Sequence, residues 1–206
     1  LENQANTTAT DTYNVAMGYK AGEAVTTGIQ NTLIGGLAGD VLTDADYNVA
    51  VGVSALGADT LGSKSTALGY SALTAQNFTT ATDTYNTAVG YTAGMSVTTG
   101  VNNTLIGGLA GDALTDADHN TAVGRASLSA DTLGSRSTAL GFQALSSQNF
   151  TTATDTYNTA VGFNAGVSVS TGVQNTLIGG LAGDAITAGY NNVALGYDAL
   201  STDTLG

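Results

Sequence analysis

The chain contains no cysteine, proline or tryptophan, and only four of its 206 residues are lysine or arginine. Without cysteine it can form no disulfide and offers no thiolate ligand, a composition compatible with an exported protein that is stabilised in other ways. Sixteen acidic residues give a formal net charge of −12. This balance argues against nucleic acid as a partner, because phosphate binding needs lysine and arginine. No apolar run approaches the roughly 20 residues of a membrane span, so we expect no membrane insertion of this segment.

Groups suited to catalysis are equally scarce. The sequence has one histidine, His119, and no serine within a G-x-S-x-G turn. Neither a nucleophile with its base nor a zinc site can be assembled from this set. His119 occupies a position that Tyr47 and Asn191 hold in sister repeats, which favours a solvated turn residue. We therefore expect no enzyme activity and no cofactor.

The dominant feature of the chain is a five-residue motif, [N/S]-[T/V]-[A/L]-[V/I/L/M]-G, which occurs eleven times. We refer to this motif as the phrase. Three 17-residue spacings between successive copies are followed by one 21-residue spacing, so a 17-residue unit is nested within a 72-residue unit. A fixed short period is typical of proteins that stack one structural unit on itself. We predict a single repetitive segment over residues 1–206, with super-repeats at about 1–64, 65–136 and 137–206. Because the pattern starts and stops inside copies, we expect an excerpt of a longer chain.

Each unit is numbered from its Asn or Ser as position 1. The β-branched phrase before the glycine predicts a short strand, and positions 7 to 13 predict a second, weaker strand. Glycine at position 15 of most units is expected in a return turn with positive φ. Position 5 is glycine in every unit, as expected for a structural turn, at Gly18, Gly35, Gly52, Gly69, Gly90, Gly107, Gly124, Gly141, Gly162, Gly179 and Gly196.

Strand, turn, strand and turn make one coil of a parallel β-solenoid, or β-roll. We therefore predict an all-β fold of about eleven 17-residue coils stacked about 4.8 Å apart. Position 1 is expected to form an asparagine ladder along the rod, and position 4 an aliphatic core. Positions 3 and 4 point to opposite faces of the strand, yet both are apolar. We expect the small face of positions 3 and 5 to pack against equivalent chains along the rod, most simply as a homotrimer, although this argument does not set their number. A broad monomeric solenoid is the alternative.

The four extra residues of the 21-residue spacing predict a threonine-rich loop in each super-repeat, within residues 76–85 and 148–157. Such loops would offer repeated contacts to a cell-surface glycan or protein receptor. The possible contact residues are Asn77, Phe78, Thr79, Tyr85, Asn149, Phe150, Thr151 and Tyr157. For the aromatic residues at position 6, we favour ordinary packing of the rings over turns.

Asp112, Asp116 and Asp118 form a weak candidate calcium site, because alternating carboxylates in one turn region can bind this ion. The third copy of the turn retains only one of these acids, Asp184. The spacing also fits neither an EF-hand nor the glycine-rich calcium solenoid. We therefore favour solvated turn carboxylates at these positions.

The phrase N-T-A-V-G, followed by an aromatic residue, x-A and a T-T-G turn, occurs at residues 86–93 and 98–100. It resembles the head repeats of YadA-like trimeric autotransporter adhesins, and still more the N-T-A-[V/I]-G-Y-x-A-L repeats of phage tail fibres. The resemblance covers nearly the whole chain. It implies a left-handed parallel β-roll, three chains around one axis, and a surface-exposed adhesive fibre. The adhesin heads use a shorter coil, and their neck and membrane anchor are not seen in this sequence.

These observations predict a non-enzymatic, extracellular segment of a structural or adhesive fibre, on a virion or a bacterial cell surface. A stiff rod with repeated loops would attach by many weak contacts. A structural subunit of an extracellular filament that binds no receptor is the alternative. An ice-binding solenoid is the second alternative, since position 2 is Thr or Val in every unit, although this strand is expected to be buried.

Overall fold

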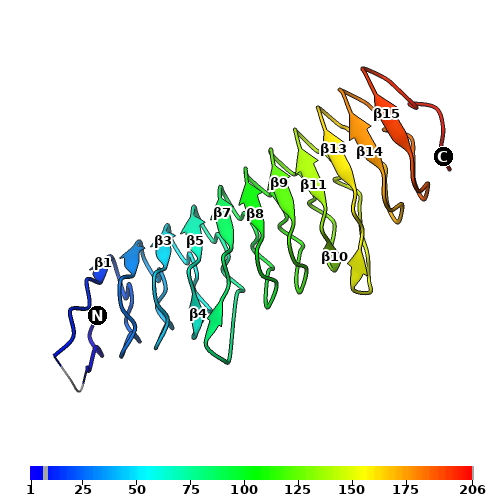
Figure 1. Ribbon diagram of the computed structural model, residues 1–206. Helices are drawn as coiled ribbons and strands as arrows, with labels where there is room; N and C mark the ends of the chain where they lie inside the picture. The colour runs from blue at the N-terminus through cyan, green and yellow to red at the C-terminus, as the bar shows by residue number, and fades with distance from the viewer. Residues whose placement is uncertain (7–8, 206) are drawn as a thin grey trace.

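The protein is a rod of stacked coils that begins and ends at opposite tips (Figure 1). The structure is a computed structural model that describes residues 1–6 and 9–205. Over these residues the chain is all-β, without a helix. None of the described segments is therefore a helix of the length and apolar character needed to cross a membrane.

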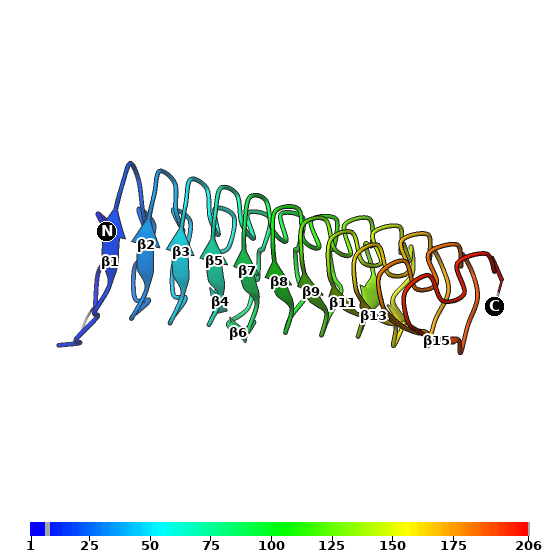
Figure 2. The ribbon, with the colours of Figure 1, turned by 90° about the horizontal axis from the view of Figure 1, so that it is seen from above.

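One long parallel sheet runs the length of the rod, and each of its strands comes from positions 2 to 4 of a repeat (Figure 2). Its strands, in spatial order, are β1 (Val15–Met17), β2 (Thr32–Ile34), β3 (Val49–Val51), β5 (Thr66–Leu68), β7 (Thr87–Val89), β8 (Thr104–Ile106), β9 (Thr121–Val123), β11 (Thr138–Leu140), β13 (Thr159–Val161), β14 (Thr176–Ile178) and β15 (Val193–Leu195). Two smaller sheets pair β4 (Gly62–Ser63) with β6 (Thr82–Asp83), and β10 (Gly134–Ser135) with β12 (Thr154–Asp155).

Equivalent residues of successive repeats lie side by side in the long sheet. Thr87 pairs with Thr104 across the 17-residue spacing, and Thr66 pairs with Thr87 across the 21-residue spacing. The extra residues therefore leave the sheet without shifting its register. The prediction of a parallel β-solenoid of about eleven coils is confirmed.

A ladder of buried position 1 side chains runs beside the sheet, as the sequence predicts. The Asn31 side-chain oxygen accepts a hydrogen bond from the Asn48 backbone N–H, at 2.9 Å. The Asn48 amide donates in turn to the Gly62 carbonyl oxygen of its own coil, at 3.0 Å. Each such asparagine thus closes its own coil and binds the next one. Unpaired, these buried amides would each cost about 1–3 kcal/mol.

The core of each coil is filled in one of two ways. In the first, position 12 is aliphatic, as at Leu42, and position 9 is glycine, because a Cβ on Gly39 would lie 2.7 Å from Leu42 Cδ1. In the second, position 12 is polar, as at Asp59, and the fully buried Leu56 at position 9 supplies the apolar volume. The two choices exchange large and small residues while the interior stays closely packed.

The strand faces the opposite way from our expectation. At position 3, Ala88 and Leu105 are fully buried, whereas Val89 and Ile106 at position 4 lie half-buried and exposed on the outer side. The interior of a coil is narrow, and Ala93 at position 8 shares it with position 3. This space suits alanine with an occasional leucine, so the uniformly larger residues at position 4 point outward.

The predicted second strand is also absent from the described coils, where positions 7 to 11 form turns. Non-glycine residues at positions 7 and 9 have positive φ, as at Ser71 (φ 51°) and Leu73 (φ 50°), and this interrupts an extended conformation. The described position 15 glycines do not have the positive φ that we expected, and glycine is instead required there by the close approach of the next coil. A Cβ on Gly100 would lie 2.4 Å from the Ala117 carbonyl oxygen of the next coil.

Two adjacent glycines provide a test of the coil geometry. Gly107, at position 5, has φ of 131°, and a Cβ there would lie 2.6 Å from the Gly124 backbone of the next coil. We expect Gly107→Ala to lower the free energy of unfolding by about 3 kcal/mol or more, through backbone strain and this clash.

Gly108→Ala is the matched control, because among the described residues, apart from Gly108 and its chain neighbours, its added Cβ has only the Tyr91 carbonyl oxygen within 4 Å, at 3.9 Å. We expect it to change stability by about 0.5 kcal/mol or less. Denaturant unfolding of both variants measures the difference, and equal effects would contradict the assignment.

Candidate functional site

The outer side of the long sheet carries exposed and half-buried apolar side chains along the described part of the rod. We call the side chains of positions 2 and 4 on this sheet the outer face. Its position 4 members are exposed or half-buried, and they are Met17, Ile34, Val51, Leu68, Val89, Ile106, Val123, Leu140, Val161, Ile178 and Leu195. An uncovered apolar stripe on a flat sheet is a surface suited to association.

Aromatic rings at position 6 border the outer face along one edge. Tyr70 stacks on Tyr91 with ring centroids 5.4 Å apart and planes at 11°. Phe142 and Phe163 repeat this arrangement at 5.4 Å and 9°. These two pairs of rings therefore stack along the rod and remain partly exposed.

The loop of the 21-residue coil begins where the asparagine ladder is interrupted by Ser65. The Ser65 hydroxyl is too short to close the coil, and Gln76 takes over by donating to the Ser65 Oγ at 2.8 Å and to an oxygen of the buried Asp59 at 2.5 Å. Asn86 at the start of the next coil donates to the Gln76 side-chain oxygen at 2.9 Å. These hydrogen bonds connect three successive coils at the base of the loop.

The buried carboxylate of Asp59 fixes the first residues of the loop. Its Oδ1 accepts from the backbone N–H groups of Gly62, at 3.0 Å, and Phe78, at 3.1 Å. Asp131 makes the corresponding contacts with Gly134 and Phe150 in the next super-repeat. Full pairing is what allows a carboxylate to occupy a core position.

The structure divides the predicted contact residues into two groups. Phe78 and Phe150 are only 7% and 8% exposed, so they anchor the loops and do not belong to the contact surface. Beyond them the loops turn outward and reach further from the sheet than the ordinary turns (Figure 1). The remaining six residues are exposed, and they are Asn77, Thr79, Tyr85, Asn149, Thr151 and Tyr157.

A second column of side chains borders the outer face on the edge opposite to the position 6 rings. It contains the last residue of each coil, immediately before position 1, and we call it the ridge. Its members have positive φ and project from successive coils, and they are Tyr13, Gln30, Tyr47, Lys64, Tyr85, Asn102, His119, Arg136, Tyr157, Gln174 and Asn191. None of them is aliphatic. The absence of aliphatic residues from this position in every coil is visible in the sequence and could have predicted the ridge.

At the loops, a cation holds the ridge tyrosine in place. Lys64 Nζ donates to Asp83 Oδ2 at 2.6 Å and to the Tyr85 hydroxyl at 3.2 Å, and it lies 5.2 Å from the centre of the Tyr85 ring. The hydrogen bond to Asp83 raises the pKa of Lys64. Arg136 binds Asp155 at 2.8 Å in the next super-repeat, where it lies over the ring of Tyr157.

The candidate calcium ligands do not converge. Among residues 1–6 and 9–205 no group of three or more His, Asp or Glu side chains is arranged to hold a metal ion. Asp116 accepts a hydrogen bond from Thr99, at 2.7 Å, and Asp118 accepts one from the Val101 backbone N–H, also at 2.7 Å. Asp112 differs, because its Oδ1 is buried without a hydrogen-bond partner. Two of the three acids thus stabilise coil stacking.

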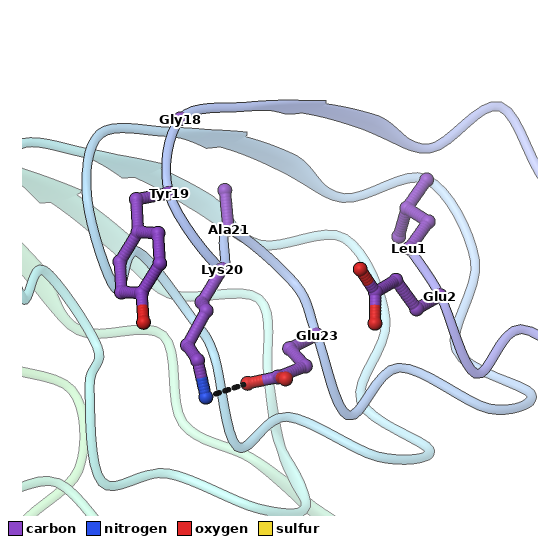
Figure 3. A pocket seen from close by; sticks show the side chains of 7 residues that line it. All are labelled: Leu1, Glu2, Gly18, Tyr19, Lys20, Ala21 and Glu23. Atoms are coloured by element: carbon purple, nitrogen blue, oxygen red, sulfur yellow. Dashed lines mark ion pairs between the residues drawn. The ribbon is translucent and has the colours of Figure 1, made fainter.

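A pocket occurs at the N-terminal tip, where Leu1 and Glu2 approach the turn from Gly18 to Glu23 (Figure 3). Lys20 and Glu23 form an ion pair of 3.0 Å at its edge. Leu1 contacts the first complete coil much as Leu73 contacts a later one, at Gly22 and Gly94 respectively. The pocket is therefore bounded by Leu1, Glu2 and residues of the first numbered coil.

The buried oxygen of Asp112 gives a pH-dependent prediction. Burial raises the pKa of the Asp112 carboxyl, so the folded protein holds this proton more tightly than the unfolded chain does. The contribution of Asp112 to stability is therefore fully present below the unfolded pKa of about 3.9 and is lost as the pH rises through the higher folded value.

We accordingly expect Asp112→Asn to stabilise the protein at pH 7 by up to about 1 kcal/mol, a figure that allows for solvent screening of this half-buried group. The gain should disappear near pH 3. Asp116→Asn is the control and should give no gain, because Thr99 pairs with its exposed carboxylate. Thermal unfolding across this pH range measures both variants, and a gain that persists at pH 3 would contradict the prediction.

Comparison with known proteins identifies no relative of this chain. No family model, no curated protein and no solved structure matches it. The arrangement of its own residues is therefore the basis for the functional proposals that follow.

Proposed function

We propose that this chain is a segment of an extracellular structural or adhesive fibre, in which copies of the rod associate through the outer face. The observation that supports this function is the uninterrupted line of aliphatic side chains across the eleven strands of the long sheet. A flat apolar sheet without a cover on one side is normally buried against another layer. The described residues contain no helix, and their two further sheets each pair only two residues per strand, which is too small to cover this face.

The size of the outer face is consistent with stable association. Eleven strands at about 4.8 Å, and about four residues of width at 3.3 Å each, give roughly 700 Å² per chain. Typical stable interfaces bury about 800 Å² per partner, and the aromatic rim at position 6 would add to the estimate. The partner surface is thus the face of positions 2 and 4, and not the face of positions 3 and 5 that the sequence favoured.

The resemblance to YadA-like heads and phage tail fibres supports three chains around one axis and a location on a cell surface or virion. Within such a fibre the stacked coils serve as a stiff spacer. The loops and the ridge recur in each super-repeat and would give multivalent attachment. A filament subunit that binds no receptor uses the same association and differs only in lacking this attachment.

Native mass tests the association. We expect the protein to be an oligomer at micromolar concentration, and Ile106→Lys, in the middle of the outer face, to shift it to the monomer because a charge would be buried. Ser147→Lys is the matched control, since Ser147 is exposed in a turn at position 11. A monomeric wild-type protein in analytical ultracentrifugation would reject the proposed interface.

Ice binding is a second candidate function, because the outer face carries a regular threonine array. Seven successive strands place position 2 threonines in register, at Thr66, Thr87, Thr104, Thr121, Thr138, Thr159 and Thr176. None of these hydroxyls hydrogen-bonds to another described residue, so all seven are available to water. The strand that we expected to be buried therefore presents its threonines outward.

The two candidate functions make opposite predictions, because one face cannot be covered by another chain and by ice at once. An ice-binding protein should be a monomer with measurable thermal hysteresis, and Thr121→Lys should abolish the hysteresis by disrupting the flat array. Ser147→Lys should leave it unchanged. Absence of hysteresis in the wild-type monomer would rule out ice binding.

A further inference from the structure

The ridge is built from planar and hydrogen-bonding side chains that are mostly exposed, whereas the asparagine column of position 1 is mostly buried. Tyr85 and Tyr157 are 53% and 52% exposed even though their positions are fixed by Lys64 and Arg136. Tyr85 ends its coil, with Lys64 in the preceding coil and Asn102 in the following one. Lys64, which lies over the ring, and Asn102 are therefore the ridge residues of the two coils that flank Tyr85.

The amides beside the two rings have no partner within the described part of the protein. Asn102 and Gln174 are exposed, and their side chains make no hydrogen bond to another described residue. Their backbones are nonetheless fixed, because the Asn102 N–H donates to the Thr84 carbonyl oxygen at 2.8 Å and the Gln174 N–H donates to the Thr156 carbonyl oxygen at 2.7 Å. Each amide offers donors and an acceptor next to an exposed ring. The combination thus occurs once in each of two super-repeats, with Arg136 in place of Lys64 in the second.

The charges on the ridge favour a neutral ligand. Lys64 and Arg136 are each paired with a carboxylate, Asp83 and Asp155 respectively. The ridge thus has little free positive charge, and the chain as a whole carries −12. An anionic polymer would be repelled over the length of the rod.

We propose that the ridge binds an extended, β-linked neutral polysaccharide that lies along the rod. Its sugar rings stack on Tyr85 and Tyr157, and its hydroxyl groups exchange hydrogen bonds with Asn102 and Gln174. Sugars have an apolar C–H face and a polar hydroxyl edge, and exposed rings beside free amides complement both. Successive coils contribute ridge residues about 4.8 Å apart, close to the length of one sugar unit in an extended chain. This inference rests on the proposed attachment function and assigns its ligand class.

Native gel electrophoresis through two soluble cellulose derivatives tests the ligand class. Hydroxyethylcellulose is neutral, whereas carboxymethylcellulose has the same backbone with negative charges. We expect hydroxyethylcellulose to retard the wild-type protein and carboxymethylcellulose to leave its mobility unchanged. Retardation by the anionic polymer alone, or by neither polymer, would overturn the proposal.

Variants of the ridge test the residues. Tyr85→Ala combined with Tyr157→Ala should weaken retardation about tenfold or more, because two contacts of a multivalent site are lost. Tyr85→Phe with Tyr157→Phe keeps both rings and should retain most of the binding. Tyr190→Ala is the control, since this exposed ring lies in neither the ridge nor the aromatic rim. Equal losses in the ridge and control variants would overturn the assignment.

The native mass of each variant separates this inference from the proposed fibre. Both proposals are supported if all variants are oligomers of the wild-type mass and only the variant with Tyr85→Ala and Tyr157→Ala is no longer retarded. A wild-type monomer that hydroxyethylcellulose retards would reject association through the outer face and support the ridge. Circular dichroism and thermal unfolding confirm that the variants keep the wild-type fold, so that lost retardation reports on binding.

Discussion

The architecture depends on the buried side chain at position 1. Each asparagine there from Asn14 to Asn175 donates to a carbonyl oxygen of its own coil and accepts from the backbone of the next, as Asn103 does with Ala117 and Asn120. This pair of bonds fixes both the closure of a coil and the distance to its neighbour. Identical positions then form straight columns, and a column is the unit from which the outer face, the aromatic rim and the ridge are all made.

The same ladder explains where the rod departs from uniformity. Serine at Ser65 and Ser137 cannot close a coil, and a buried Asp and Gln take over this role at the base of each long loop. Position 9 changes to leucine in these coils, so the core keeps its volume while position 12 becomes polar. Every four coils, the super-repeat thus replaces an aliphatic core residue at position 12 with a polar one. In the same region a cation, a carboxylate and a tyrosine come together at the ridge.

Much of the fold could be predicted from the sequence, because a given repeat position has the same structural environment in every coil and so keeps the same type of residue. The parallel solenoid, the strand, the asparagine ladder and the position 5 glycines were all predicted correctly. The second strand was wrong, because residues such as Leu73 adopt positive φ under tertiary constraint, against their own preference. For the loops, the sequence could not distinguish the exposed Tyr85 from the buried Phe78, whose backbone N–H donates to the buried Asp59.

The sequence by itself determined the period, the number of coils and the columns into which residues fall, since these follow from spacing alone. Only the tertiary structure decided which side of the strand faces inward. Positions 3 and 4 are both apolar in every unit, so alternation carries no information about direction. The width of the closed coil decides, because its interior accepts Ala88 and Leu105 alongside the alanines of position 8 and leaves the larger aliphatic residues outside. That choice places the apolar ladder and the threonine array on the surface, between the aromatic rim and the ridge.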